Sequence, residues 1–482
     1  MRALPDLPQA WSLAAMLSLR GVTADSREVA EGYLFAALPG ARADGRAYIA
    51  DAVAHGAAAV LAPDGTDWPP GVPPRPLLTD PEPRRRLAQI AAVLAGAQPK
   101  TVAAVTGTNG KTSTVDFLRQ IWTLHGVRAA SLGTLGLIAD GFEAGPGLTT
   151  PDPIALARML AKLARAGVTH AAIEASSHGL DQFRLDGVRL AAGAFTNLTR
   201  DHLDYHATLE NYRAAKLRLF AELLPKGAPA VASTALDPHS LTGLREIAQA
   251  RGLRLLTVGE ADDAIRILRA TPRPDGQELE IVAHDVARTI FLPLPGRFQA
   301  DNALMAAALA DATGIANAFE HLPSLKGVRG RMEVAARLPN GAAVYVDYAH
   351  TPDALERLLS ALRPHTAGRL HVVFGAGGDR DSGKRPLMGA AAAKHADAVI
   401  VTDDNPRSED PAAIRAAVLA GCPGAREVGD RAAAIEIGLN SLGAGDVLAV
   451  AGKGHEQGQQ VGNTLLPFDD AATVRRLAGA AS

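Results

Sequence analysis

The sequence predicts an α/β protein of three domains, in which a central P-loop parallel sheet is followed by a C-terminal Rossmann-like doubly wound domain. The first observation is length: at roughly 150 residues per domain, 482 residues correspond to about three domains. The second is the alternation of short apolar runs with helical patterns, which is typical of parallel sheets covered by helices. The third is a glycine-rich turn between a predicted strand and a predicted helix, which begins at Gly107.

The first domain is predicted over residues 1–98 as a small α/β unit. Its expected elements are an apolar run, an alanine-rich helix leading into a strand, a proline-rich loop, and a helix that ends before Pro99; in order these are Gly32–Leu38, Ile49–Leu61, Trp68–Pro83 and Leu87–Ala97.

The second domain is predicted over residues 99–333 and the third over residues 334–482. The second has a strand and a helix around the glycine-rich turn, two more strands, a strand-rich segment and an alanine-rich helix: Val102–Val105, Lys111–His125, Ala171–Ile173, Ala191–Phe195, residues 255–294 (with Glu278–Val282 and Thr289–Leu292) and Asn302–Ala312. The third has four predicted strands with helices between them: Val344–Asp347, His371–Phe374, Ala398–Thr402 and Val447–Ala451. This pattern predicts a second doubly wound sheet.

Composition and charge exclude several classes of function. Aromatic residues make up only 4% and the net charge is −2, so no partnership with nucleic acid or an anionic membrane is indicated. The single cysteine, Cys422, can form no intrachain disulfide and is interpreted as a small loop residue. We find no signal peptide and no apolar run of about 18 residues, so we expect a cytoplasmic protein without membrane insertion.

The glycine-rich turn is the most informative single motif. In Gly107-Thr108-Asn109-Gly110-Lys111-Thr112, backbone N–H groups can surround phosphate oxygens at a helix N-terminus. Lys111 would neutralise the β- and γ-phosphates of ATP, and the Thr112 hydroxyl would ligate Mg²⁺. The generic P-loop has a glycine five positions before Gly110, where this chain has Val105. The alternative, a simple glycine turn, is disfavoured by the strand–helix context.

Several motifs together resemble the Mur ligases, the family that builds the peptide of the bacterial cell wall. The resemblance covers nearly the whole chain and rests on Val105–Thr112, Glu174–Gly179, Thr196–His206, Tyr212–Lys216, Gly330–Glu333, Val346–Pro352 and Gly452–Glu456. It implies an ATP-dependent amide ligase that forms an acyl phosphate. Asp404–Arg407 resembles the recognition motif of members that add meso-2,6-diaminopimelate to the D-glutamate γ-carboxylate of UDP-N-acetylmuramoyl-L-alanyl-D-glutamate, in peptidoglycan precursor synthesis. We expect these two small molecules to be the substrates of a monomer.

The resemblance also implies a two-metal site for phosphoryl transfer, which needs cations between two anions. One Mg²⁺ is expected near Thr112 and Glu174, and a second at His202. Lys216 matches the lysine that this family carbamylates with CO₂, which would convert a cation into an anion able to ligate Mg²⁺. Lys111, Glu174, His202 and Lys216 form the expected catalytic set. Without the resemblance, Lys216 would be interpreted as a surface helix lysine next to Arg218.

Three sets of ligand contacts follow from the resemblance. For ATP they are the loop residues Gly107, Thr108, Asn109, Gly110, Lys111, Thr112 and Ser113, with Asn302, Arg331 and Asp347. For the UDP-muramoyl dipeptide, expected between the first two domains, they are Ala24, Ser26, Ala41, Arg42, Ala43, Thr149, Thr150, Ser176, Gln182 and Arg184. For diaminopimelate they are Arg380, Asp404, Asn405, Pro406, Arg407, Gly452 and Glu456.

Chemistry supports particular roles within these sets. Arg184 suits a carboxylate through its fork of donors, and Asn302 can read an adenine edge. The second carboxylate of diaminopimelate calls for a buried cation, for which Arg407 is the candidate. Two positions depart from the family pattern: residues 41–43 read Ala-Arg-Ala where His-Gln-Ala is common, and Leu148 stands where a polar residue is expected.

Two other interpretations remain open. One is a ligase of the same fold that adds L-lysine or extends folylpolyglutamate; Arg407 argues against the first and the N-terminal unit against the second. The other is a P-loop regulatory or binding protein that hydrolyses ATP slowly or not at all, which would not need the pair His202 and Lys216.

Overall fold

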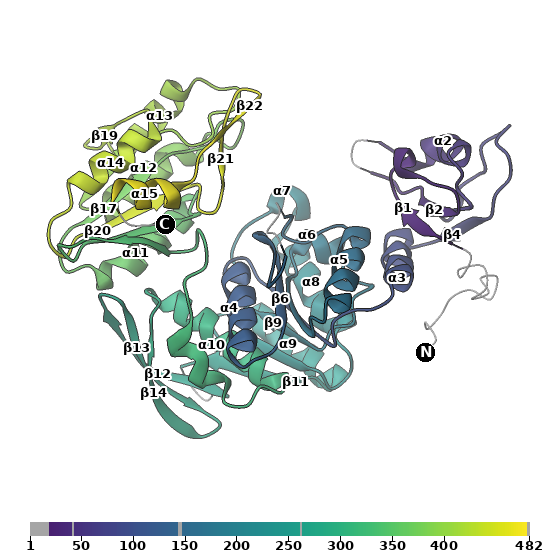
Figure 1. Ribbon diagram of the computed structural model, residues 1–482, viewed down its shortest axis with the longest axis horizontal. Coiled ribbons are helices and arrows are strands. Elements are labelled where there is room, and N and C mark those ends of the chain that lie inside the picture. Colours follow the sequence, from purple (N-terminus) through teal and green to yellow (C-terminus); the bar gives the residue numbers. More distant parts are fainter. Residues whose placement is uncertain (1–18, 41–42, 143–146, 261–262, 480–482) are drawn as a thin grey trace. The chain divides into compact units, whose positions relative to one another are not determined.

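The computed structural model describes residues 19–40, 43–142, 147–260 and 263–479 (Figure 1). The chain forms two compact units. The first contains the described residues up to Lys111 together with 126–232 and 236–255, and the second contains 112–125, 233–235 and the described residues from Leu256 onward.

The first unit begins with a small parallel sheet in the order β1-β2-β3-β4. Its strands are β1 (Gly21–Thr23), β2 (Tyr33–Ala36), β3 (Ala59–Pro63) and β4 (Leu77–Asp80). Its helices are the 3-10 turns η1 (Ser26–Glu28) and η2 (Gly45–Tyr48), with α2 (Ile49–Ala54) and α3 (Pro83–Ala95). Leu34, Leu61 and Leu78 of the strands form a core with Leu87 and Ile90 of α3.

One predicted element of this region is wrong. The segment Trp68–Pro83 was expected to be a loop throughout, but Leu77–Asp80 pairs in parallel with β3 and forms β4. The strand forms because Leu78 is buried in the core, although prolines precede and follow it. The helix expected at Leu87 begins four residues earlier, at Pro83, where the fixed φ of proline suits a first helical position.

The larger sheet of the first unit has the strand order β10-β9-β5-β8-β6-β7. The strands are β5 (Thr101–Thr106), β6 (Ala129–Gly133), β7 (Gly136–Ala139), β8 (His170–Glu174), β9 (Ala192–Phe195) and β10 (Pro229–Ser233). All neighbours are parallel except β6 and β7. The helices are α5 (Pro153–Arg165), α6 (Ser177–Asp181), α7 (Leu203–His206), α8 (Leu209–Arg218), the π-helical η3 (Leu219–Leu223) and α9 (Pro238–Arg251). The parallel sheet predicted around the glycine-rich turn is confirmed.

Strand β11 (Arg254–Gly259), whose first two residues belong to the first unit, leads into the long antiparallel strands of the second unit, β12 (Ile265–Arg273), β13 (Gly276–Ala283) and β14 (Val286–Leu292), as the strand-rich segment predicted. The helices α4 (Lys111–Leu124), α10 (Arg297–Ala312) and η4 (Ala318–Ser324) accompany them. The predicted helix at Asn302 begins five residues earlier, directly after Gly296, whose φ of 85° ends the preceding segment.

The C-terminal sheet has the order β15-β16-β20-β17-β18-β19 and is parallel except for β15. Its strands are β15 (Glu333–Arg337), β16 (Ala343–Asp347), β17 (Leu370–Phe374), β18 (Ala398–Val401), β19 (Arg426–Glu427) and β20 (Val447–Ala451). Its helices are α11 (Pro352–Leu362), η5 (Arg363–His365), α12 (Lys384–His395), α13 (Pro411–Leu419), α14 (Arg431–Asn440) and α15 (Asp470–Leu477). A hairpin of β21 (Gly458–Val461) and β22 (Thr464–Pro467) follows β20.

Both faces of this sheet are covered by helices. Along β16, Tyr345 packs in one core with residues of α11 to α13, while Val344 packs in a second core with residues of α14 and α15. This alternation is the property of a doubly wound sheet, so the predicted fold class is confirmed. In the part of the chain that the structure describes, no helix is long and apolar enough to cross a membrane.

Candidate active site

The glycine-rich turn connects β5 to α4 as the sequence predicted. Gly107 has a φ of 145° and Gly110 a φ of 83°, which side-chain-bearing residues rarely adopt. A Cβ atom on Gly107 would lie 1.9 Å from the Thr196 hydroxyl oxygen. Glycine at position 107 is therefore required both by backbone conformation and by space.

Two residues that follow β9 hold this loop in place. The Thr196 hydroxyl and the Asn197 side-chain amide donate to the Asn109 carbonyl oxygen at 2.6 and 3.0 Å. The Asn109 N–H donates to Asn197 Oδ1 at 2.9 Å, and the Thr108 N–H to the Asn197 carbonyl at 2.8 Å. Thr196 and Asn197 were not among the predicted site residues, although they belong to a motif that carried the resemblance.

Two lysine side chains converge on the carbonyl oxygen of Gly107. Lys111 Nζ lies 2.9 Å and Lys216 Nζ 2.8 Å from that oxygen. Lys216 is only 1% exposed, and its Nζ lies 4.4 Å from the centre of the Tyr212 ring. Burial and the neighbouring Lys111 cation hold the pKa of Lys216 well below its ordinary value. The interpretation of Lys216 as a surface lysine is wrong, because α8 turns it toward the loop.

Glu174 ends β8, beside β5, and is 2% exposed. Its Oε1 accepts from the Thr134 N–H at 2.8 Å and its Oε2 from the Thr134 hydroxyl at 3.3 Å. Its carbonyl oxygen accepts from the Thr150 hydroxyl at 2.7 Å. These contacts fix a carboxylate at the carboxyl edge of the sheet, where parallel α/β folds bind ligands.

His202 is the N-cap residue of α7, has a left-handed φ of 51° and lies in a cluster of aromatic rings. The His178 ring is 4.9 Å from His202 and 4.1 Å from Tyr205, and the His206 ring is 5.2 Å from Tyr212. Burial lowers the pKa of both His178 and His206. His202 itself is exposed.

The donor atoms for a divalent cation are of a suitable kind but do not form a ready cluster. Within the described ranges, no three His, Cys, Asp or Glu side chains gather in an arrangement that could hold a metal ion. Glu174 offers the hard carboxylate oxygens that Mg²⁺ prefers. Lys216 can contribute an oxygen only as a carbamate, and carbamylation needs the neutral amine that its lowered pKa favours.

Five residues expected to bind the dipeptide form one connected group with Glu174. Arg184 donates to the Thr150 carbonyl at 2.6 Å and to the Gln182 side chain at 2.7 Å. The Thr149 hydroxyl lies 3.0 Å from that of Thr134, which contacts Glu174, and the Ser176 N–H donates to Thr150 Oγ1 at 3.0 Å. Leu148, where a polar residue was expected, is 64% exposed.

Those residues expected at the uridine end that the structure describes lie in η1 and in loops beside the small sheet. Ser26 is buried in η1 and its carbonyl accepts from the His55 ring at 3.1 Å, while Ala24 and Ala43 are exposed. Ala41 and Arg42 fall outside the described residues.

Two of the residues expected to contact adenosine, Asn302 and Asp347, already form hydrogen bonds within the protein. Asn302 on α10 is 6% exposed and lies 3.4 Å from the Thr114 hydroxyl. Both carboxylate oxygens of Asp347 accept backbone N–H groups, from Met332 and Ala349 at 2.8 Å, and burial raises the pKa of Asp347. Arg331 lies over the Tyr348 ring at 4.6 Å.

The residues expected to bind diaminopimelate gather at the carboxyl edge of the C-terminal sheet. Asp404 and Asn405 follow β18, and the Asn405 amide donates to Glu456 Oε2 at 2.9 Å. A Cβ atom on Gly452, whose φ is 114°, would lie 2.5 Å from Asp404 Oδ2. Pro406 is buried between Asn405 and Arg407. Lys453, which sequence analysis missed, is fully buried among these side chains.

Arg407 and Arg380 approach the same loop. Arg407 has a left-handed φ of 52° and donates to the Gly378 carbonyl at 2.6 Å. A Cβ atom on Gly377 would lie 2.9 Å from Arg407 Nη1 and 4.0 Å from Arg380 Cγ. The Arg407 guanidinium and the Arg380 side chain thus both lie near Gly377, in the loop that follows β17.

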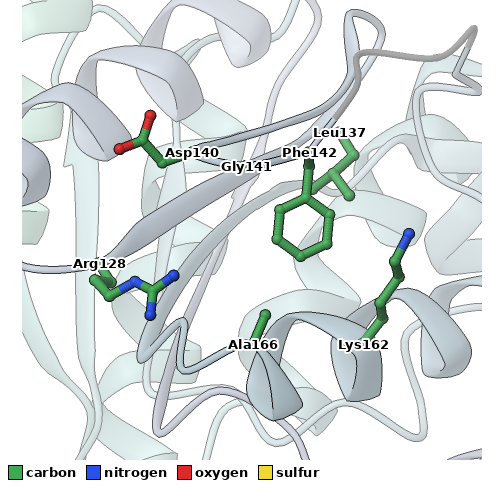
Figure 2. Close-up of a pocket in the computed structure, with 7 residues that line it drawn as sticks. All are labelled: Arg128, Leu137, Asp140, Gly141, Phe142, Lys162 and Ala166. Carbon is green, nitrogen blue, oxygen red and sulfur yellow. The ribbon is translucent and has the colours of Figure 1, made fainter.

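A cavity of about 590 Å³ in the first unit lies elsewhere (Figure 2). It is lined by Arg128, Leu137, Asp140, Gly141, Phe142, Lys162 and Ala166. Arg128 directly precedes β6 and Ala166 is the C-cap of α5, so the cavity lies at the amino edge of the parallel strands. The phosphate loop and Glu174 lie at the opposite, carboxyl edge, so this cavity is separate from the site.

A strand–loop–helix phosphate site, in a chain that continues into a second parallel sheet with charged side chains at its carboxyl edge, defines an α/β nucleotide-dependent enzyme. The sequence matches the Mur ligase family catalytic domain over residues 18–94, the Mur ligase middle domain over 105–310 and the Mur ligase glutamate ligase domain over 330–454. The chain belongs to the Mur ligase family, and the predicted class of enzyme, an ATP-dependent ligase, is confirmed.

Relatives cover nearly the whole chain. It is 54% identical over 470 residues to the UDP-N-acetylmuramoyl-L-alanyl-D-glutamate–2,6-diaminopimelate ligase of Caulobacter vibrioides, covering 96% of each chain. A solved structure of a ligase with the same name matches with a TM-score of 0.72 and 34% identity, covering 96% of this chain and 95% of the other. A MurF ligase from Thermotoga maritima, solved in complex with ADP, shares the fold with a TM-score of 0.62, 19% identity and coverage of 96% and 97%.

Proposed function

We propose that this chain adds meso-2,6-diaminopimelate to the D-glutamate γ-carboxylate of UDP-N-acetylmuramoyl-L-alanyl-D-glutamate, using ATP and an acyl phosphate intermediate. The relatives' names support this choice of substrates. The structural observation that carries the ligase chemistry is the buried side-chain nitrogen of Lys216 at the phosphate loop, 2.8 Å from the Gly107 carbonyl oxygen. We further propose that the enzyme acts as a cytoplasmic monomer on these small molecules, with domains at 1–98, 99–333 and 334–482.

At the phosphate loop, this chain's residues bind ATP and neutralise its charge. The backbone of Gly107 to Ser113 surrounds the phosphates, and Lys111 balances the β- and γ-phosphates. Glu174, His202, Thr112 and a carbamylated Lys216 would hold Mg²⁺, which when bound stabilises the charge that develops during phosphoryl transfer. Asn302, Arg331 and Asp347 are proposed to contact the nucleotide beyond the phosphates.

The γ-carboxylate of the dipeptide must be held still for phosphorylation. Arg184 is the proposed carboxylate ligand, and its hydrogen bond to the Thr150 carbonyl couples it to Glu174. Thr149, Ser176 and Gln182 complete that end of the substrate site, while Ala24, Ser26 and residues 41–43 are proposed at the uridine end. Orientation of the two reactants by bound groups is the main contribution that such a site can make.

At the carboxyl edge of the C-terminal sheet, side chains of opposite charge are proposed to bind the carboxylate and amino groups of diaminopimelate. Arg407 and Arg380 are proposed to bind a carboxylate, and Asp404, Asn405 and Glu456 an amino group, with Gly452 leaving space. A ligand that lacks the second carboxylate would leave the guanidinium groups unpaired, which disfavours lysine.

A phosphate-release screen tests the proposal. The purified enzyme receives ATP, Mg²⁺ and the UDP-muramoyl dipeptide, and candidate amino acids are added one at a time. We expect release only with dipeptide and meso-diaminopimelate together. Release with lysine instead would show a different amino-acid specificity, and release without either substrate would indicate a simple ATPase.

A further inference from the structure

A fully buried ammonium lies directly behind the residues proposed to bind diaminopimelate. Lys453 follows β20 and Gly452, and its side chain is 0% exposed. Its Nζ lies 2.9 Å from Asn405 Oδ1 and 3.3 Å from Glu456 Oε2. Burying a cation is unfavourable unless it is paired, so these two contacts must offset its loss of hydration.

Lys453 determines which way the Asn405 amide faces. Asn405 Oδ1 accepts from Lys453 and also from the Gln460 N–H at 2.9 Å. With its oxygen held by two donors, the amide must direct its NH₂ group the other way. That NH₂ group donates to Glu456 Oε2 at 2.9 Å.

The same contacts orient the Glu456 carboxylate. Its Oε2 accepts from both Lys453 and Asn405, while its Oε1 accepts no hydrogen bond from the residues that the structure describes. The Glu456 side chain is 33% exposed, so the second oxygen is available to a ligand. Close by, the Asp404 carboxylate is 7% exposed and, among the described residues, has no hydrogen-bond donor.

We propose that Lys453 is a positioning residue for amino-acid selection, acting through Asn405 and Glu456. By fixing both side chains, it presents an acceptor, Glu456 Oε1, beside a donor, the second amide hydrogen of Asn405. An acceptor next to a donor complements the ammonium and carboxylate of one amino-acid end. This inference rests on the proposed use of diaminopimelate.

A second buried cation, Arg431, has contacts that are purely structural and serves as a comparison for Lys453. Arg431 is also fully buried, but it pairs with Asp470 at 2.7 Å and donates to the carbonyl oxygens of Ala451 and Asp403. These contacts join α14 to α15 and to the ends of two strands. Lys453 differs because both of its side-chain hydrogen bonds go to residues proposed to bind diaminopimelate, Asn405 and Glu456.

The test is the variant Lys453→Met, which keeps an unbranched side chain only one atom shorter and removes its charge. Initial rates of phosphate release are measured against each substrate in turn. We expect the KM for diaminopimelate to rise about tenfold or more, while the KM for ATP and that for the dipeptide stay within about twofold. The matched control is Lys394→Met, since Lys394 is 68% exposed and pairs with Glu356; it should change nothing.

A double variant separates positioning from general damage. If Lys453 acts through Asn405, the effects of Lys453→Met and Asn405→Ala on the KM for diaminopimelate will not multiply in the double variant. An unchanged KM for diaminopimelate, an equal rise in the KM for ATP, or independent effects of the two substitutions would each overturn the inference.

Folding is checked by thermal unfolding of each variant. Glu456 is partly exposed and can be hydrated when the ammonium is removed, so Lys453→Met should fold. If it does not, Lys453→Gln retains one donor and takes its place, and failure of both to fold would assign Lys453 a structural role and overturn the proposal. A wild-type enzyme that uses another amino acid but not diaminopimelate would refute the proposed function, a result distinct from an unchanged KM in the variant.

Discussion

The side-chain nitrogen of Lys216 donates a 2.8 Å hydrogen bond to the carbonyl oxygen of Gly107, joining the last turn of α8 to the first glycine of the phosphate loop. The two residues are 109 positions apart in sequence. Lys216 is buried and lies beside Lys111. Burial and the neighbouring positive charge lower its pKa, which favours the neutral amine. A neutral amine is the form that can react with CO₂.

The first prediction concerns catalysis by Lys216. We expect Lys216→Ala to lose phosphate release almost completely and to regain part of it when a small carboxylic acid is supplied, since the acid would replace the carbamate oxygens. The exposed residue Lys226 provides the control, because Lys226→Ala should retain full activity. Undiminished activity of Lys216→Ala would remove the basis for a carbamate.

The second prediction concerns stability and pH in CO₂-free buffer. Because the pKa of Lys216 is lowered in the folded protein, the unfolded state binds a proton more readily between that lowered pKa and the ordinary value of 10.5. The free energy of unfolding of the wild type should therefore fall as pH falls through this window, by up to about 1.4 kcal/mol per pH unit. The variant Lys216→Met has no titrating amine at this position and should not show this pH dependence.

Urea unfolding at pH 7, 8.5 and 10 measures the difference. Lys216→Met should gain stability relative to the wild type as the pH is lowered, although it is inactive. A difference that stays constant across the three pH values would mean that the lysine is protonated in the fold.

The third prediction concerns the shape of the loop. Gly107→Ala would place a Cβ atom 1.9 Å from the Thr196 hydroxyl at a φ of 145°, so the loop must deform. We expect ATP binding and phosphate release to fall about a hundredfold or more. Gly424→Ala is the control, because nothing lies within 4 Å of the added carbon and its φ is not positive; nucleotide titration of both variants decides the matter.

The fourth prediction concerns the amino-acid pocket. Charged hydrogen bonds contribute about 1.5–3 kcal/mol, so Arg407→Ala should raise the KM for diaminopimelate about ten- to a hundredfold. The KM for ATP should stay near the wild-type value. The exposed Arg426 supplies the control variant Arg426→Ala, and an equal loss of both substrates in Arg407→Ala would rule out a selective role.

The sequence predicted the fold class well because strand–helix alternation is a local property of the chain. Strand β4 was missed because its short apolar pair, Leu77 and Leu78, lies among prolines, and only the tertiary pairing with β3 makes it a strand. Helix starts were misplaced by four or five residues at Pro83 and Arg297, where the backbone preferences of Pro83 and Gly296, and not apolar spacing, set the boundary.

The candidate site was predicted through motifs, but its internal contacts were not. The burial of Lys216 depends on the path of α8, and the support of the loop by Thr196 and Asn197 depends on β9 lying beside β5. Lys453 is three residues from Glu456, yet its partner Asn405 is 48 residues away. Contacts between residues so far apart in the sequence leave no motif spacing from which they could be predicted.

The anchoring of Asn109 by Thr196 and Asn197 has a consequence for nucleotide capture. Residues from about ninety positions later in the chain already hold the loop, so its conformational entropy is lost during folding and not during ligand association. Binding of the phosphates then needs little rearrangement of the loop. As denaturant is added, nucleotide affinity should be lost together with the folded sheet, with no intermediate in which the sheet is folded but the loop is disordered.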